Sequence, residues 1–69
     1  MSRERVYEAV MVFLASKYGP VELELSRTYD RQGVVEVAGK FRLESGGGWR
    51  RFTLLLSKKD MKVLGFGMR

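Results

Sequence analysis

The residues that could support catalysis in this sequence are carboxylates and hydroxyls, because the chain contains neither histidine nor cysteine. The missing histidine removes the commonest general base and metal ligand, and the missing cysteine removes thiolate chemistry, thiolate zinc sites and disulfides. Glu22, Glu24 and Glu36 are expected on the outer face of a sheet, an open surface without the desolvated pocket that paired catalytic carboxylates need. Their expected role is cross-strand ion pairing with Lys40 or Arg42. We therefore predict no catalytic residues, no metal site, no cofactor and no enzymatic activity.

Basic residues gather in the C-terminal half and surround the single tryptophan. The whole chain has a net charge of +5, and residues 40–69 contribute most of the basic excess. Cations beside an exposed aromatic ring are suited to a phosphate backbone and an unstacked base. One hypothesis is therefore nucleic-acid binding through Lys40, Arg42, Trp49, Arg50, Arg51, Lys58, Lys59 and Lys62. The alternative is that these charges keep turns and sheet edges soluble, within a thermophile-like composition rich in charged residues.

The run Gly46–Gly48 precedes Trp49 but does not predict a phosphate-binding loop. A P-loop needs a strand before it, a helix after it and a Lys-Ser or Lys-Thr pair at its end. Here a strand that opens with Trp49-Arg50-Arg51 is expected to follow. The glycines instead indicate a hairpin turn.

A second hypothesis rests on apolar residues that are expected on the outer sheet face. A sheet with one helix on it normally presents a more polar face to water. The last strand, which contains two glycines, is also expected to be an open edge suited to pairing between copies. We therefore favour a small non-catalytic interaction module, either a homo-oligomer or a partner for another protein. Its expected interface residues are Val34, Ala38, Trp49, Leu55 and Val63, with Trp49, Leu55 and Val63 as anchors.

Two hydrophobic periods predict the elements that position these residues. Apolar residues recur at helical spacing up to Tyr18, and Gly19-Pro20 stops the pattern, which predicts a helix over about residues 3–18. After Pro20 the period becomes two, which predicts four short strands separated by turns at residues 29–33, 45–48 and 57–60. Because every connection is short, we predict a single α+β domain over residues 1–69. Its helix should pack on a four-stranded antiparallel meander in the order α-β-β-β-β.

Alternation along each strand also predicts which side chains face the helix. The outward set is expected to include Glu22, Glu24, Ser26, Thr28, Arg51, Thr53, Val63, Gly65 and Gly67. Gly39 interrupts the inward row, which indicates either a β-bulge or a place where the helix approaches closely. The expected inward set is Val21, Leu23, Leu25, Tyr29, Val35, Val37, Phe41, Leu43, Phe52, Leu54, Leu56, Leu64, Phe66 and Met68.

This helix-plus-meander outline resembles small cystatin-like modules, the PepSY type among them. The similarity lies in the helix end Lys17–Gly19, the strand Val34–Val37 and the closing hairpin Leu54–Leu64. PepSY-type repeats often close with a Thr-Gly turn, where this sequence has Lys59-Asp60-Met61. The resemblance implies an inhibitory or interaction domain and transfers no functional residues. With no long apolar run and no cysteine, we expect no signal peptide, no membrane association and a cytoplasmic location.

Overall fold

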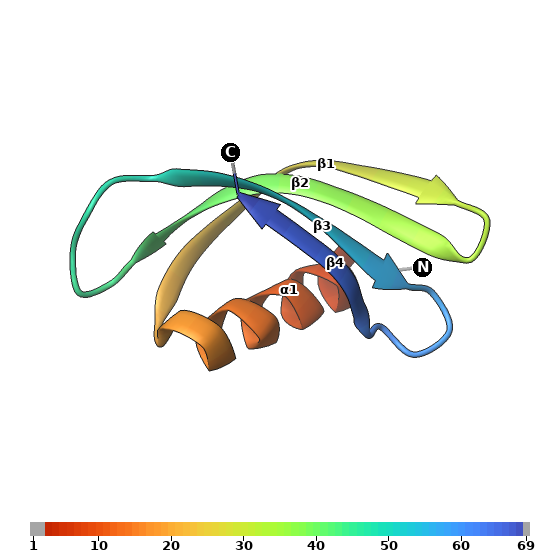
Figure 1. Cartoon of the computed structure of the whole chain (residues 1–69), viewed down its shortest axis with the longest axis horizontal. Helices are drawn as coiled ribbons and strands as arrows, with labels where there is room; N and C mark the ends of the chain where they lie inside the picture. Colours follow the sequence, from red (N-terminus) through yellow and green to blue (C-terminus); the bar gives the residue numbers. More distant parts are fainter. Residues whose placement is uncertain (1–2, 69) are drawn as a thin grey trace.

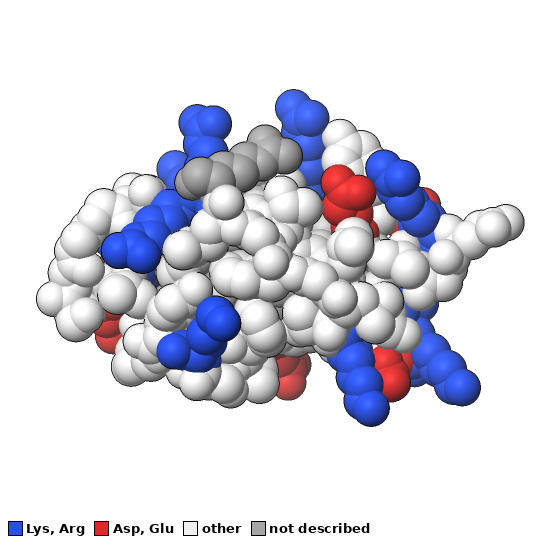
Figure 2. Space-filling view, viewed as in Figure 1, with Lys and Arg blue, Asp and Glu red and all other residues white. Residues whose placement is uncertain are grey.

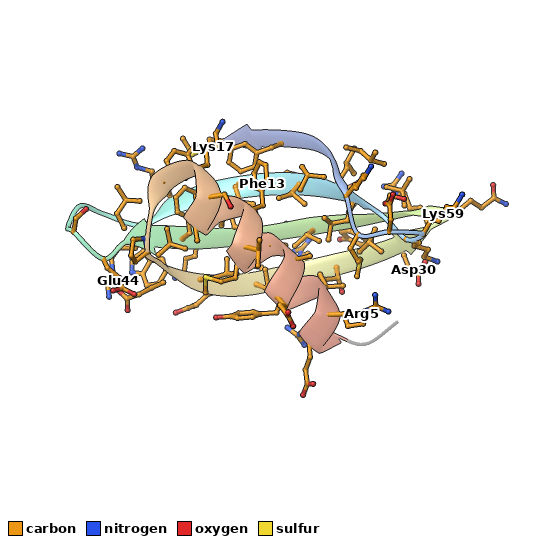
Figure 3. All side chains as sticks on the ribbon, turned by 90° about the horizontal axis from the view of Figure 1, so that it is seen from below. Arg5, Phe13, Lys17, Asp30, Glu44 and Lys59 are labelled. Atoms are coloured by element: carbon orange, nitrogen blue, oxygen red, sulfur yellow. The ribbon has the colours of Figure 1, made fainter. Side chains whose placement is uncertain are left out.

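The computed structural model describes residues 3–68, which form one helix and four strands. These elements are α1 (Arg3–Tyr18), β1 (Val21–Arg31), β2 (Val34–Leu43), β3 (Arg50–Ser57) and β4 (Val63–Met68). The strands make one antiparallel sheet in the order β1-β2-β3-β4, and α1 lies obliquely across one face of it (Figures 1 and 3). The predicted α+β class, the element order and the meander are confirmed.

The end of α1 follows the predicted stop signal. Gly19 takes a φ of 85°, a left-handed conformation that suits glycine, and its N–H donates to the carbonyl oxygen of Ala15 at 2.9 Å. Pro20 cannot continue the helical hydrogen bonds, and its carbonyl oxygen accepts the N–H of Glu44 at 3.1 Å. The chain therefore turns directly from the helix into β1.

The core lies between α1 and the inner face of the sheet. Its aromatic rings form a series of contacts that starts and ends on the helix. Tyr18 stacks on Phe41, Phe41 meets Phe52, Phe52 meets Phe66, and Phe66 meets Phe13, with ring centroids 5.2–6.2 Å apart. Such pairs add about 0.5–1.5 kcal/mol each beyond the burial of apolar area. The buried core residues are Val6, Val10, Leu14, Val21, Leu23, Val35, Val37, Phe41, Phe52, Leu54 and Leu56.

A β-bulge at Ser26 changes the facing of the second half of β1. Leu25 pairs with Gly39, but the next pair along the strands is Arg27 with Ala38, so β1 contains one extra residue. An extra residue moves all later side chains to the opposite face. The extra residue belongs to β1, opposite Gly39 and Ala38, whereas β2 itself, where a bulge was one of the two expectations at Gly39, alternates through Gly39 without a break.

The prediction for the end of β1 was wrong as a result. Tyr29 pairs with the outward-facing Glu36 and is 44% exposed, whereas Thr28 pairs with the buried Val37. The sequence alternation predicted the reverse, because it continued past Ser26 without a break.

A second β-bulge, in β4, reverses the predicted facing of Val63 and Leu64. Leu55 pairs with Gly65 and Leu56 with Val63, so Leu64 is the extra residue. Val63 packs against the core, although it was predicted to face outward, and Leu64 is 59% exposed, although it was predicted to face inward. Met68 pairs with the buried Phe52 and so faces inward as predicted, although it lies at the end of the strand and is 44% exposed.

Two hydrogen bonds close the turn before β4. Met61 donates its N–H to the carbonyl oxygen of Ser57 at 2.8 Å, and the N–H of Lys62 reaches Oδ1 of Asp60 at 3.1 Å. Met61 has a φ of 61°, which is uncommon for a residue with a Cβ. Its side chain packs against the core, so this contact offsets the unfavourable backbone conformation.

Candidate interaction surfaces

Trp49 lies over the outer face of the sheet, beside two cations of β2. Lys40 Nζ is 4.9 Å and Arg42 Cζ is 4.8 Å from the centroid of its ring. Arg42 also contacts Glu22 of β1 at 2.6 Å, and Lys40 lies 3.8 Å from Glu24. These are the cross-strand ion pairs that the sequence predicted. They offset the charge of both cations, while the ring itself remains 38% exposed.

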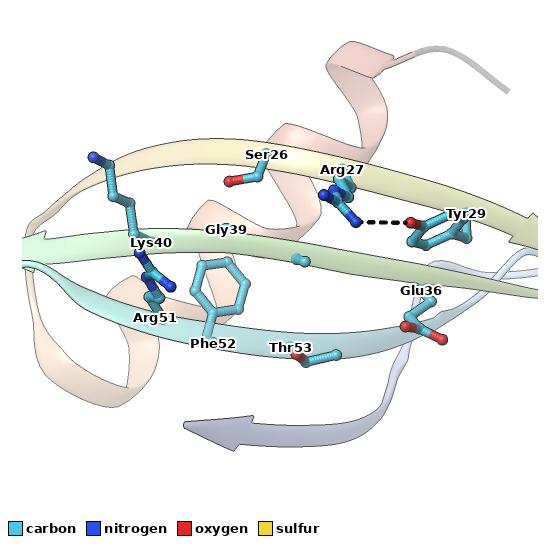
Figure 4. Close-up of a pocket in the computed structure, with 10 residues that line it drawn as sticks. Ser26, Arg27, Tyr29, Glu36, Gly39, Lys40, Arg51, Phe52 and Thr53 are labelled. Carbon is cyan, nitrogen blue, oxygen red and sulfur yellow. Dashed lines mark hydrogen bonds between the residues drawn. The ribbon is translucent and has the colours of Figure 1, made fainter. Parts of the chain in front are cut away.

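A hollow of about 580 Å³ opens on the same face, next to this cluster (Figure 4). Its floor is formed at Ala38 and Gly39, where side chains are smallest. The residues around this floor have longer side chains and come from three adjacent strands, so they form the rim of the hollow. They include Arg27, Tyr29, Glu36, Lys40, Arg51 and Thr53.

The hollow has more cations than carboxylates. Arg27, Lys40 and Arg51 line it, whereas Glu36 is the lining carboxylate and lies 3.3 Å from Arg31. Within residues 3–68, the side chain of Arg51 has no hydrogen bond or ion pair, and the side chain of Arg27 has only a 3.3 Å hydrogen bond from Nη1 to the Tyr29 hydroxyl. The guanidinium groups of these two arginines therefore keep most of their donors available.

Thr53 places a polar atom at this site without a partner. Its Oγ1 is buried and makes no hydrogen bond within the described part of the chain. Thr53 lies on β3 between Ala38 of β2 and Gly67 of β4, two residues that bring no polar side-chain group to it. A buried hydroxyl without a partner costs about 1–3 kcal/mol, so a donor or acceptor that reached it would remove this cost.

The predicted nucleic-acid residues do not form a single patch. Lys40, Arg42, Trp49 and Arg51 come together on the outer face, but Arg50 pairs with the buried Phe41 and therefore lies on the helix side. The remaining three, Lys58, Lys59 and Lys62, lie around the β3–β4 turn. This turn is at the opposite end of the sheet from Glu44 (Figure 3).

The charge of the β3–β4 turn is also partly neutralised, because Lys58 forms an ion pair with Asp30. In the space-filling view, basic side chains project from the top of the molecule, where the sheet lies, and also from its lower right (Figure 2). The front, over α1 and β4, is mostly uncharged (Figure 2).

The predicted apolar interface residues do not all lie on the same face of the sheet. Val34, Ala38 and Leu55 face outward as expected, but Val63 turns into the core. Leu55 is 36% exposed and lies over Gly65, where a Cβ would be 3.6 Å from Leu55 Cδ1. The role of these residues in a partner interface stays a prediction.

The two edge strands differ sharply in charge. Within residues 3–68, β4 pairs only with β3. It contains no charged residue over Val63–Met68, and its Leu64 and Met68 side chains are 59% and 44% exposed. The other edge strand is β1, whose charged residues are Glu22, Glu24, Arg27, Asp30 and Arg31. Charges on an edge strand oppose pairing with another chain. In the described sheet, β4 is therefore the edge that lacks this protection.

Sequence reasoning missed three residues of the hollow as possible site residues, namely Arg27, Tyr29 and Thr53. For Arg27 a signal was present, because unbroken alternation would place this charged residue on the core face beside Leu25. That conflict indicates a register break between them. Thr53 was expected on the outer face, but its sequence context contains no sign that its hydroxyl would lack a partner.

Comparison of the chain with models of protein families, with curated proteins and with solved structures found no match. The resemblance to cystatin-like modules therefore stays a prediction. Over residues 3–68, no helix has both the length and the apolar character needed to cross a membrane. Within the same range, the acidic side chains form no group of three that could hold a metal ion.

Proposed function

We propose that this protein is a non-catalytic interaction module that forms a homodimer by antiparallel pairing of its β4 strands. The observation that carries the proposal is the contrast between the charged edge β1 and the uncharged edge β4 with its exposed Leu64. An edge strand exposes unpaired backbone N–H and C=O groups. A second strand satisfies these groups without any specific side-chain chemistry.

A second copy fits this edge because a twofold interface must be complementary to itself. Two copies of β4 bring no charge to one another over Val63–Met68, and the nearest cations in the sequence, Lys62 and Arg69, flank this stretch. Gly65 and Gly67 add no side chains that would collide across the twofold axis. The exposed Leu64 side chains would lose contact with water, at about 25 cal/mol per Å² of apolar area buried.

The test is sedimentation velocity on the full chain and on two matched variants. Leu64→Lys adds a cation to the exposed bulge of β4 and should convert the dimer to a monomer. Tyr29→Lys adds the same charge to the opposite edge, at a side chain that is 44% exposed, and should leave the dimer unchanged. Circular dichroism would verify that both variants keep the fold, since neither position is buried.

Two results would contradict β4 pairing. The first is a wild-type chain that sediments as a monomer at every concentration. The second is a dimer that survives Leu64→Lys but is lost in Tyr29→Lys, because that dimer would use the β1 edge.

A further inference from the structure

We propose that the outer-face hollow binds a phosphate of a single-stranded nucleic acid, with neighbouring bases against Tyr29 and Trp49. The proposal does not depend on β4 pairing, because the hollow lies over β1, β2 and β3. It rests on four features of the hollow, namely its shape, its two arginines without ion pairs in the described chain, its unpartnered hydroxyl and the aromatic rings beside it.

The cations define the chemical class of the ligand. Arg27, Lys40 and Arg51 reach the hollow from β1, β2 and β3, and Lys40 is the one of the three with an ion pair, at 3.8 Å to Glu24. Guanidinium groups present several N–H donors in a fixed plane that matches the oxygens of a phosphate. An anionic ligand would therefore find donors that no carboxylate of the described chain occupies.

The hydroxyl of Thr53 points to a ligand that is polar as well as charged. Thr53 Oγ1 is buried beside the hollow and has no partner within residues 3–68. A phosphate oxygen accepts hydrogen bonds from hydroxyl groups as well as from arginines. One phosphate could therefore engage Arg51 and Thr53, which lie two residues apart on the same face of β3.

The aromatic rings favour a single strand over a duplex. Tyr29 is 44% exposed and pairs across the strands with Glu36, whereas Trp49 adjoins Lys40 and is 38% exposed. Glu36 and Lys40 are four residues apart on β2, which corresponds to roughly 13 Å along the strand. One base cannot span this separation. Two bases could each stack on one ring, and the sugar-phosphate backbone that joins them would then cross the hollow. Stacking on either ring requires a base that is not already stacked in a duplex.

The test is fluorescence anisotropy with labelled single-stranded DNA and RNA oligonucleotides, and with a duplex of the same sequence. We expect the single strands to bind and the duplex to bind more weakly. Arg51→Gln and Arg27→Gln should each weaken single-strand binding roughly tenfold. Each should also reduce the slope of log affinity against log salt by about 0.7 per lost phosphate contact. Lys59→Gln is the matched control, because it removes the same charge from the β3–β4 turn, which does not line the hollow, and should change neither quantity.

Thr53 supplies a second, independent variant pair. Thr53→Val removes the hydroxyl and keeps the side-chain shape, so the fold is retained while binding should weaken by roughly threefold. Thr53→Ser keeps the hydroxyl and should bind like the wild type. Non-specific attraction by a basic surface would not distinguish valine from serine at this position.

Three results would overturn the proposal. They are no binding to any of the oligonucleotides, equal losses in Arg51→Gln and Lys59→Gln, or a duplex that binds as tightly as the single strand. Sedimentation of the Arg51→Gln variant without oligonucleotide reports β4 pairing separately. The dimer and the nucleic-acid site can therefore fail independently of each other.

Discussion

Trp49 is held over the sheet by contacts with charged residues and does not belong to the buried core. Its ring lies within 5 Å of Lys40 Nζ and Arg42 Cζ, and both cations are tied to glutamates of β1. Cation–π contacts at exposed positions are worth about 0.5–1 kcal/mol. These contacts therefore hold the ring at one end of the outer face and add only a little to the stability of the fold.

Replacement of Trp49 by alanine tests this description. The variant should remain folded and lose only about 0.5–1 kcal/mol of unfolding free energy, because the cation contacts are lost while the core is intact. Trp49→Phe, which keeps an aromatic ring, should lose less. Urea denaturation followed by far-ultraviolet circular dichroism measures both. An unfolded Trp49→Ala chain would show that the ring supports the core, contrary to its position.

Arg27 shows why the candidate site could be predicted only in part. Lys40, Arg42, Trp49 and Arg51 were expected on the outer face from simple alternation, and the structure brings these four together. Arg27 reaches the same face only because Ser26 is an extra residue in β1. Alternation assigns every second residue to the same face of the sheet. It can therefore reveal a bulge only where the unbroken pattern would place a polar residue in the core.

Gly39 sets how closely β1 and β2 approach beside the bulge. A Cβ at this position would lie 2.4 Å from the carbonyl oxygen of Glu24 and 3.1 Å from Cα of Leu25. Both atoms belong to the backbone, so neither can move aside without shifting β1. The close approach expected at Gly39 therefore comes from the neighbouring strand and not from the helix.

Gly39→Ala should consequently destabilise the fold by about 1–3 kcal/mol, the usual cost of forcing extra atoms into a packed site. Gly65→Ala is the matched control. Its new Cβ would meet Leu55 Cδ1 at 3.6 Å, an ordinary contact, so the change should stay within about 0.5 kcal/mol. Thermal and urea denaturation at low protein concentration compare the two. A larger loss for Gly65→Ala would contradict the assignment of the close contact to Gly39.

At the scale of elements, the sequence predicts which helices and strands exist and their order better than it predicts which face the side chains at the strand ends occupy. The helix was predicted over about residues 3–18 and is observed over Arg3–Tyr18, since Gly19-Pro20 is a strong stop signal. The central rows of β2 and β3 also alternate as predicted. The ends of β1 and β4 do not, because each bulge adds one residue to an edge strand. Val63 and Leu64 are both apolar, so no conflict in the sequence marks the second bulge.

At the scale of the whole molecule, charge separates the two proposed surfaces. The chain has a net charge of +5, but β4 carries no charge over Val63–Met68, and the hollow is lined by three cations and one carboxylate. Two copies that approach through β4 therefore bring uncharged strands together while their net positive charges repel each other. Salt screens this repulsion, with a Debye length of about 10 Å at 0.1 M.

The two surfaces should consequently respond to salt in opposite directions. Between roughly 50 and 200 mM sodium chloride, phosphate binding should weaken steeply as counterions compete for the cations. Over the same range the β4 dimer should hold or tighten, because its apolar contacts persist while repulsion between the two chains is screened. Sedimentation with a labelled single-stranded oligonucleotide measures both in one sample, since protein and label are followed at different wavelengths. A dimer that dissociates together with the oligonucleotide as salt rises would mean that charge also holds the two copies together, which an uncharged β4 edge cannot explain.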